Sequence, residues 1–245
     1  MSHHTAPWPR RPGPVARITS HRTPSGKLRW IATLAPEADQ AYECAVARVV
    51  PALERRSGPE VLADRAHPSA GPSIRLAPWE PARRRWRALS ERAIAGKVRA
   101  VVVADVRDCF GSVMPPTVAE ALRAAGASPS SVERVIACLL AFADDGISGL
   151  PVGPVASAVL GNAALVPLDE ALRARDVPHL RWVDDVAAFA SSRGEARRAL
   201  ESLRRAAAGI GLELHDVKTR ILDDPEEARS IFGIPNSRGA ATGVA

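Results

Sequence analysis

The stretch HLRWVDDVAAFA, residues 179–190, contains two adjacent carboxylates, Asp184 and Asp185, between two apolar runs. This pattern predicts two short buried strands joined by a tight acidic turn. Two like charges held beside a core raise each other's pKa and need a compensating positive charge. A divalent cation such as Mg²⁺ would supply it, because Mg²⁺ binds carboxylate and water oxygens. An exposed Asp-Asp turn is the simpler alternative, since acidic turns are common.

A second acidic pair, Asp144 and Asp145 in AFADDGISG, illustrates that simpler alternative. The pair runs directly into Gly146 and Ser148, so solvent and turn chemistry are sufficient for it. We therefore expect Asp144 and Asp145 to lie outside any metal site.

A third carboxylate, Asp105, lies in the stretch VRAVVVADVRDCFGSV, at the end of its apolar run. Phe110 follows five residues later. An apolar strand that ends in a carboxylate places that group at the edge of the sheet, where an acidic turn from another strand can meet it. Asp105, Asp184 and Asp185 can then converge. Asp108 is expected to be a solvated turn residue.

The composition is that of a globular protein. The chain has 245 residues, of which 46% are apolar, enough for one large domain or two small ones. The cysteines Cys44, Cys109 and Cys138 lie far apart and have no CxxC spacing, so the sequence suggests neither a zinc site nor a disulfide framework. The N-terminus has no apolar signal core, and no apolar run reaches the roughly 18 residues of a membrane span. We expect a soluble, cytoplasmic protein without a membrane partner.

The charge is unevenly distributed along the chain. Residues 1–99 hold 18 basic and 8 acidic residues, and residues 100–245 hold 15 and 19, within a net charge of +6. A basic half suits a polyanion and an acidic half suits metal ions. Lys27, Lys97 and Lys218 are the only lysines. A lysine near phosphates can give up a proton, which arginine does not, so Lys218 is a candidate general acid.

The basic half contains two candidate contacts for phosphates or bases. ARITSHRTPSGKLRWIATL predicts a hairpin with Lys27 and Arg29 on its return strand, where they either reach phosphates or form a solvated face. PWEPARRRWRALSERAIAG predicts a basic helix in which arginines surround Trp86. Such a mixture suits single-stranded nucleic acid, and the alternative is a basic helix with a docked tryptophan.

Three further segments complete the pattern. A helix is expected from Pro36, with an apolar stripe at helical spacing. GLPVGPVASAVLGNAALVPLDEAL predicts a loop shaped by glycines, including Gly153, and a long helix with Ser157 in its first turns and a kink at Pro167. GLELHDVKTRIL predicts a last hairpin with Lys218 near its turn.

Together these segments resemble the catalytic domain of the reverse transcriptases over roughly residues 15–235. ADVRDCF resembles their first palm motif, GLPVGPVASAVLGNAAL the second, RWVDDVAAF the YxDD motif and GLELHDVKT the fourth. SIFGI, residues 230–234, resembles the strand pair that grips the primer, and PSGKLRWIATLAPEADQ resembles the finger segment that holds the triphosphate. The motifs occur in the family's order and spacing, which favours the metal site over the exposed turn.

The resemblance implies roles for single residues. Asp105, Asp184 and Asp185 would hold two Mg²⁺ ions, with Mn²⁺ as an alternative, and Lys218 would protonate the leaving group. The other expected substrate-binding positions are the phosphate-binding pair Lys27 and Arg29, the loop and helix residues Gly153 and Ser157, and the aromatic residues Phe110 and Trp182. Phe110 occupies the position of the gate that collides with a ribose 2′-hydroxyl, and it argues for deoxynucleotides.

Two substitutions depart from the family pattern. Trp182 stands where tyrosine is usual, which keeps a flat surface near the primer end but loses the hydroxyl. Val152 stands where many relatives have glutamine, so one contact to the nucleotide sugar is missing. With these features and its small size, the chain resembles the divergent bacterial defence-associated and abortive-infection reverse transcriptases more than the retroviral or group II intron enzymes.

The implied fold class is α+β, a palm with an antiparallel sheet backed by helices, with fingers and without a thumb. The expected divisions are a disordered segment 1–14, fingers at 15–76 and 113–148, a palm at 77–112 and 149–235, and a flexible tail at 236–245. Because a thumb normally holds the duplex, we expect a partner subunit, a homo-oligomer or a structured RNA to replace it.

The expected function is synthesis of a DNA product from deoxynucleoside triphosphates, on an RNA template. One alternative is a catalytically silent palm that binds nucleic acid or a partner protein. Another is a template-independent or protein-primed polymerase.

Overall fold

The computed structural model describes residues 16–22, 28–67 and 73–234. The predicted segments 1–14 and 236–245 and the candidate residue Lys27 lie outside the described residues.

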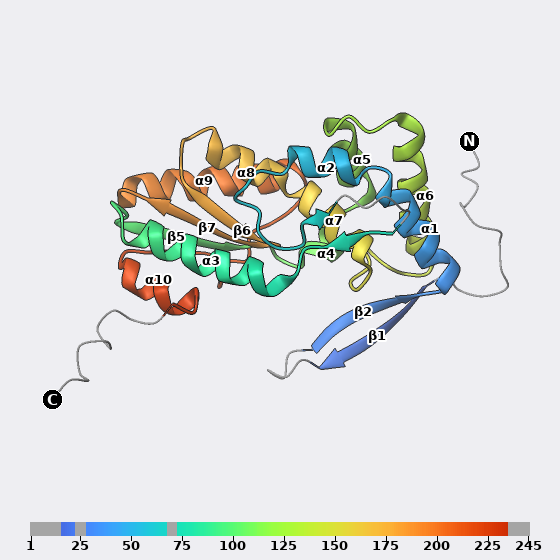
Figure 1. Cartoon of the computed structure of the whole chain (residues 1–245), viewed down its shortest axis with the longest axis horizontal. Helices are drawn as coiled ribbons and strands as arrows, with labels where there is room; N and C mark the ends of the chain where they lie inside the picture. Colours follow the sequence, from blue (N-terminus) through green and yellow to red (C-terminus); the bar gives the residue numbers. More distant parts are fainter. Residues whose placement is uncertain (1–15, 23–27, 68–72, 235–245) are drawn as a thin grey trace.

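A four-stranded antiparallel sheet forms the centre of the structure, with strand order β6-β7-β5-β8. Its strands are β5 (Ala100–Asp105), β6 (His179–Trp182), β7 (Asp185–Ala190) and β8 (Arg220–Leu222). Figure 1 shows α8 (Val166–Arg173) and α9 (Arg193–Gly209) on one face, with α3 (Trp79–Ile94) and α10 (Pro225–Ile231) on the other. The antiparallel sheet backed by helices is confirmed.

The residues of β5 divide between two cores. Val102 and Ala104 belong to the larger cluster, which includes α9, whereas Val101 packs with Trp86 of α3 and Phe232 beyond α10. Alternate residues of a strand point to opposite faces, so both faces of β5 are covered. This explains why the strand reads as a continuous apolar run rather than as an alternating pattern.

The other elements form a helical layer and two small hairpins (Figure 1). The helices are α1 (Pro36–Ala47), α2 (Val50–Arg56), α4 (Cys109–Ser112), α5 (Pro115–Ala124), α6 (Pro129–Asp144) and α7 (Val155–Ala164). The hairpins pair β1 (Ala16–Arg22) with β2 (Leu28–Leu34) and β3 (Ala66–His67) with β4 (Arg75–Leu76). The assignment of these parts to fingers and palm remains a prediction.

The helices follow the prolines closely. Pro36 lies in the first turn of α1, and the predicted stripe is buried, although the helix is interrupted after Ala47 and α2 begins at Val50. Pro167 lies in the first turn of α8, directly after α7 ends at Ala164. Proline is tolerated in a first turn because its missing N–H would have no partner there.

The predicted hairpin in GLELHDVKTRIL is wrong. Leu214 forms a bridge to Val106, and β8 pairs with β5 a few residues later, so both parts lie along the same edge. Residues 215–219 leave this edge and return to it as a short turn, closed by bonds from the amides of Lys218 and Thr219 to the carbonyl of His215. The chain therefore pairs along the β5 edge both before and after this turn.

The strand pair expected at residues 230–234 is also wrong. Ser230 and Ile231 end the helix α10, and the chain then turns into the core at Phe232. The Phe232 ring packs edge-on against Trp86, with ring centroids 5.7 Å apart. Apolar packing against α3 explains this segment without strand pairing.

One stretch of the described residues, Val155–Arg173, is long and apolar enough to cross a membrane by length and composition. It comprises α7 and α8, and 72% of its apolar window is buried inside the fold. Its hydrophobicity is that of core helices.

Candidate active site

Sheet register brings the acidic residues together. Asp105 ends β5 and lies directly opposite Asp185, the first residue of β7. Asp184 precedes it in the turn, where its carbonyl accepts a bond from the Val106 amide at 3.3 Å. Opposite residues of an antiparallel pair point to the same face of the sheet. The register therefore gathers three aspartates at one end of the two central strands.

The electrostatics of this end favour a bound cation. The pKa of Asp185 is raised from 3.8 to about 6, first by loss of hydration among the surrounding protein atoms and then by repulsion from Asp184 and Asp105. The side chains of Lys218 and Arg83 act in the opposite direction. Closely spaced carboxylates of this kind are the donor set that binds hard cations such as Mg²⁺ and Mn²⁺.

Lys218 reaches this cluster from the turn at residues 215–219. Its Nζ lies 2.7 Å from Oδ2 of the nearly buried Asp105. The hydrogen bond to Asp105 raises the pKa of Lys218, and attraction to the other aspartates adds to the effect. The turn at residues 215–219 thus places the Lys218 ammonium beside the acidic cluster.

Trp182 lies beside the acidic turn and directly opposite Asp185 on the neighbouring strand. The Arg83 guanidinium stacks over its ring at 5.3 Å from the centroid, and Trp86 packs edge-on at 6.0 Å. Trp86 itself is only 4% exposed, so the docked-tryptophan alternative is confirmed. Of these two rings, the half-buried Trp182 is the one at the edge of the candidate site.

Phe110 lies in the short helix α4, which follows β5 after the exposed Asp108. Its ring is half-buried against α7, where a Cβ built on Gly161 would lie 3.6 Å from the ring. Gly149 has a φ of +65°, and a Cβ there would lie 2.4 Å from the Phe110 carbonyl oxygen. That oxygen accepts a bond from the Leu150 amide at 2.8 Å. The helix and the loop are therefore in backbone contact.

Residues 25–231 match the family described as "Reverse transcriptase (RNA-dependent DNA polymerase)". The chain belongs to the reverse transcriptase family. A comparison with curated proteins gives no match. Membership supports a polymerase-type nucleotidyltransferase, and it implies nucleic acid and deoxynucleoside triphosphates as ligands and divalent metal as cofactor.

The loop that contains Gly153 contacts the N-terminal hairpin. The Ala32 amide of β2 donates to the Val152 carbonyl at 2.8 Å, and a Cβ on Gly153, whose φ is +127°, would lie 3.2 Å from the Ala32 carbonyl oxygen. Arg29 is on the same strand, opposite His21. The strand bearing a candidate phosphate ligand is thus joined to the loop by its backbone.

Ser157 is fully buried in α7. Its hydroxyl lies 3.1 Å from the hydroxyl of Tyr42 in α1, within the core. The structure therefore gives Ser157 a role in helix packing, and a direct contact with substrate stays a prediction. Asp144 ends α6 and is exposed, and Asp145 accepts a bond from the Ala16 amide at 2.9 Å.

Sequence reasoning missed the buried Arg181, which lies three residues before Asp184. Its side chain is fully buried and bonded to Asp169 and Asn162. The signal is present in the sequence, because a charged residue between His179-Leu180 and Trp182 in a buried strand needs a partner. The partner, Asp169, lies in an amphipathic helix, and from the sequence alone it would be interpreted as an ordinary surface residue.

Proposed function

We propose that the chain is a metal-dependent DNA polymerase that extends a primer with deoxynucleoside triphosphates on an RNA template. The observation that carries the proposal is the pairing of Asp105 with Asp185 in register, with Asp184 in the adjoining turn. Lys218 is bonded to the first of these carboxylates.

The side chains present fit the metal ions that the family implies. Three carboxylates offer oxygen ligands, and the pKa of Asp185 is raised first by loss of hydration and then by repulsion from Asp184 and Asp105. A divalent cation would relieve that repulsion, since it stabilises the ionised forms. Two Mg²⁺ ions held by Asp105, Asp184 and Asp185 would activate the primer 3′-hydroxyl and stabilise the negative charge of the triphosphate.

Lys218 is the proposed general acid. Its ammonium holds its proton firmly beside Asp105. With Asp105 engaged as a metal ligand, the Lys218 ammonium would be available to protonate the leaving pyrophosphate. Arg29, on the strand that contacts the loop around Gly153, would bind the triphosphate together with Lys27.

Sugar selection is assigned to Phe110. Its backbone is fixed by the loop residues Gly149 and Leu150, and its ring is held against α7. A ring held in this way excludes a 2′-hydroxyl by steric overlap, and it has no polar atom to accept that hydroxyl. Trp182 with Arg83 would support the primer end, because flat rings and arginine stack on bases.

The test is incorporation of labelled deoxynucleotides with Mg²⁺ or Mn²⁺, with and without an RNA template. We expect templated incorporation that Asp105→Asn and Asp185→Asn abolish. Asp144→Asn is the matched control, because Asp144 belongs to the acidic pair expected outside the site, and it should leave incorporation unchanged. Incorporation without template would support a template-independent polymerase instead. Nucleic-acid binding without any incorporation would indicate a silent palm.

A further inference from the structure

A fully bonded arginine lies directly behind the acidic turn. Arg181 of β6 donates from Nε to Asp169 Oδ1 and Oδ2, each at 3.0 Å, and from Nη2 to Oδ2 at 2.8 Å. Nη1 donates to Asn162 Oδ1 at 2.9 Å and Nη2 to the Asn162 carbonyl at 3.2 Å. Asn162 donates in turn to the carbonyls of Ala63 and Asp64. A planar guanidinium with this many partners has a fixed orientation.

The same guanidinium also holds the turn itself. Nη1 of Arg181 donates to the Val183 carbonyl at 3.0 Å. Val183 occupies the first position of the two-residue turn between Trp182 and Asp185, and its φ is +55°. Such a φ is strained for a β-branched residue and persists only where the surroundings enforce it. Arg181 is one such constraint on the peptide that leads into Asp184.

We propose that Arg181 is a positioning residue for the metal-binding turn. Anchored by Asp169 and Asn162, it fixes the Val183 carbonyl and thereby the direction in which the carboxylates of Asp184 and Asp185 leave the turn. The inference rests on the proposed function, because it takes these two aspartates as metal ligands.

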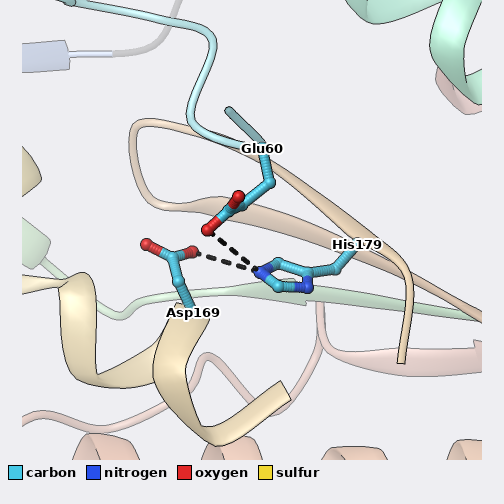
Figure 2. A group of neighbouring side chains, drawn as sticks. All are labelled: Glu60, Asp169 and His179. Carbon is cyan, nitrogen blue, oxygen red and sulfur yellow. Dashed lines mark ion pairs between the residues drawn. The ribbon is translucent and has the colours of Figure 1, made fainter. Parts of the chain in front are cut away.

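The neighbouring cluster of Glu60, Asp169 and His179 belongs to this support. Figure 2 shows the His179 ring directed at both carboxylates, with Nε2 3.6 Å from Asp169 Oδ1 and 3.9 Å from Glu60 Oε1. Both carboxylates already have cationic partners, since Arg181 binds Asp169 and Arg173 lies 2.9 Å from Glu60. Each carboxylate of the cluster is thus neutralised by an arginine, and Asp169 is held in place by Arg181.

The test must distinguish an effect of Arg181 on the position of the turn from effects of its substitution on protein stability and on the local charge. Arg181→Met alone would remove a positive charge, which favours cation binding, and would leave Asp169 buried without its partner. The double variant Asp169→Leu with Arg181→Met removes both charges, so the net charge near the turn is unchanged. Replacing a buried ion pair by apolar residues is often neutral for stability. The bond to Val183 is broken in the double variant all the same.

Three measurements are made on the full chain: the melting temperature, the Mn²⁺ dissociation constant from water-proton relaxation, and amide hydrogen exchange at Asp184 and Asp185. We expect the double variant to melt near the wild-type temperature. Its Mn²⁺ dissociation constant should rise about tenfold or more, as when outer-shell partners of metal ligands are removed, and both amides should exchange faster. Wild-type Mn²⁺ affinity together with wild-type exchange would overturn the proposal.

Arg181→Lys covers the case in which the double variant does not fold. A lysine keeps the charge beside Asp169, but a single ammonium lacks the fork that reaches Asn162 and Val183 together. We again expect a higher Mn²⁺ dissociation constant and faster amide exchange at Asp184 and Asp185. The absence of both changes in a folded Arg181→Lys protein would refute the positioning role. Failure of the wild type to bind Mn²⁺ would refute the proposed function, whereas the exchange measurement decides the role of Arg181 independently.

Discussion

Lys218 and Asp105 form an ion pair, with Nζ 2.7 Å from Oδ2. Their pairing joins the candidate general acid to a candidate metal ligand. The bond raises the pKa of Lys218 above its ordinary value, so the lysine is fully charged at neutral pH. In the metal-free site, Lys218 therefore neutralises part of the negative charge of the three aspartates.

Replacing Lys218 by methionine should slow nucleotide incorporation about 10²-fold, which is within the usual contribution of a general acid. Lys218→Arg should also be slow, because arginine keeps the charge but does not release a proton at neutral pH. Single-turnover incorporation with saturating Mg²⁺ measures this step. Lys97→Met is the control, since Lys97 is exposed beyond α3, and it should react at the wild-type rate. A fully active Lys218→Arg enzyme would limit Lys218 to a purely electrostatic role.

Asp185 should destabilise the metal-free protein above pH 6. Its pKa is raised from 3.8 to about 6 in the folded state, so its favourable contribution is present below pH 3.8 and is lost as the pH rises through 6. Asp185→Asn should therefore stabilise the metal-free protein at pH 7.5 by about 1 kcal/mol, a figure reduced for solvent screening of an exposed residue. The gain should shrink toward pH 4.

Urea unfolding at several pH values measures this effect. Asp144→Asn serves as the control and should show no comparable gain, since Asp144 is exposed on α6. Adding Mn²⁺ should stabilise the wild type more than Asp185→Asn. A stabilising effect of Asp185→Asn that grew as the pH fell would contradict the raised pKa.

Phe110→Val should admit ribonucleotides, because the clash with the 2′-hydroxyl is steric. The quantity to measure is the ratio of kcat/KM for deoxynucleotide and ribonucleotide, which we expect to fall at least about tenfold, the effect of little more than 1.4 kcal/mol of lost discrimination. Valine is preferred to alanine because the ring packs in the core and a smaller cavity costs less stability. An unchanged ratio in a folded variant would assign Phe110 to packing alone.

Arginines of α3 should contribute to nucleic-acid affinity without sequence preference. Arg84 and Arg85 are exposed on this helix, next to the Arg83 that stacks on Trp182. Replacing both by alanine should reduce the slope of log affinity against log salt by about 1 for each phosphate that these arginines neutralise. The charge-matched control is alanine at the exposed Arg204 and Arg205 of α9. Equal reductions in the two variants would indicate a general charge effect.

The acidic cluster could be predicted because each of its aspartates is marked by the pattern of the residues next to it in the sequence. Strand β5 is apolar up to Asp105, and the β6–β7 turn is marked by Asp184 and Asp185, so an antiparallel register is enough to bring them together. Lys218 stands out by its rarity among arginines, although the hairpin predicted around it is wrong. The sequence shows no sign that residues 215–219 detour from a single edge strand, because this depends on pairing with β5.

The buried support of the site could not be predicted in the same way. Arg181, Asp169 and Asn162 come from three separate elements, and their bonds depend on how α7 and α8 pack against β6. The segment at Ser230 resembles a strand pair in sequence, but packing of Phe232 against α3 decides its conformation. Tertiary contacts of this kind override local patterns.

The close approach of Gly149 to the Phe110 carbonyl has a consequence for engineering of this enzyme. A Cβ at position 149 would lie 2.4 Å from that oxygen, and φ is already +65°, so any other amino acid would force the backbone of α4 or of the loop to shift. A mutant library aimed at new sugar analogues should therefore vary Phe110 and keep position 149 constant. With Phe110 as the proposed sugar gate, substitutions at 149 would disturb the gate and the fold together, and a screen would record both as loss of activity.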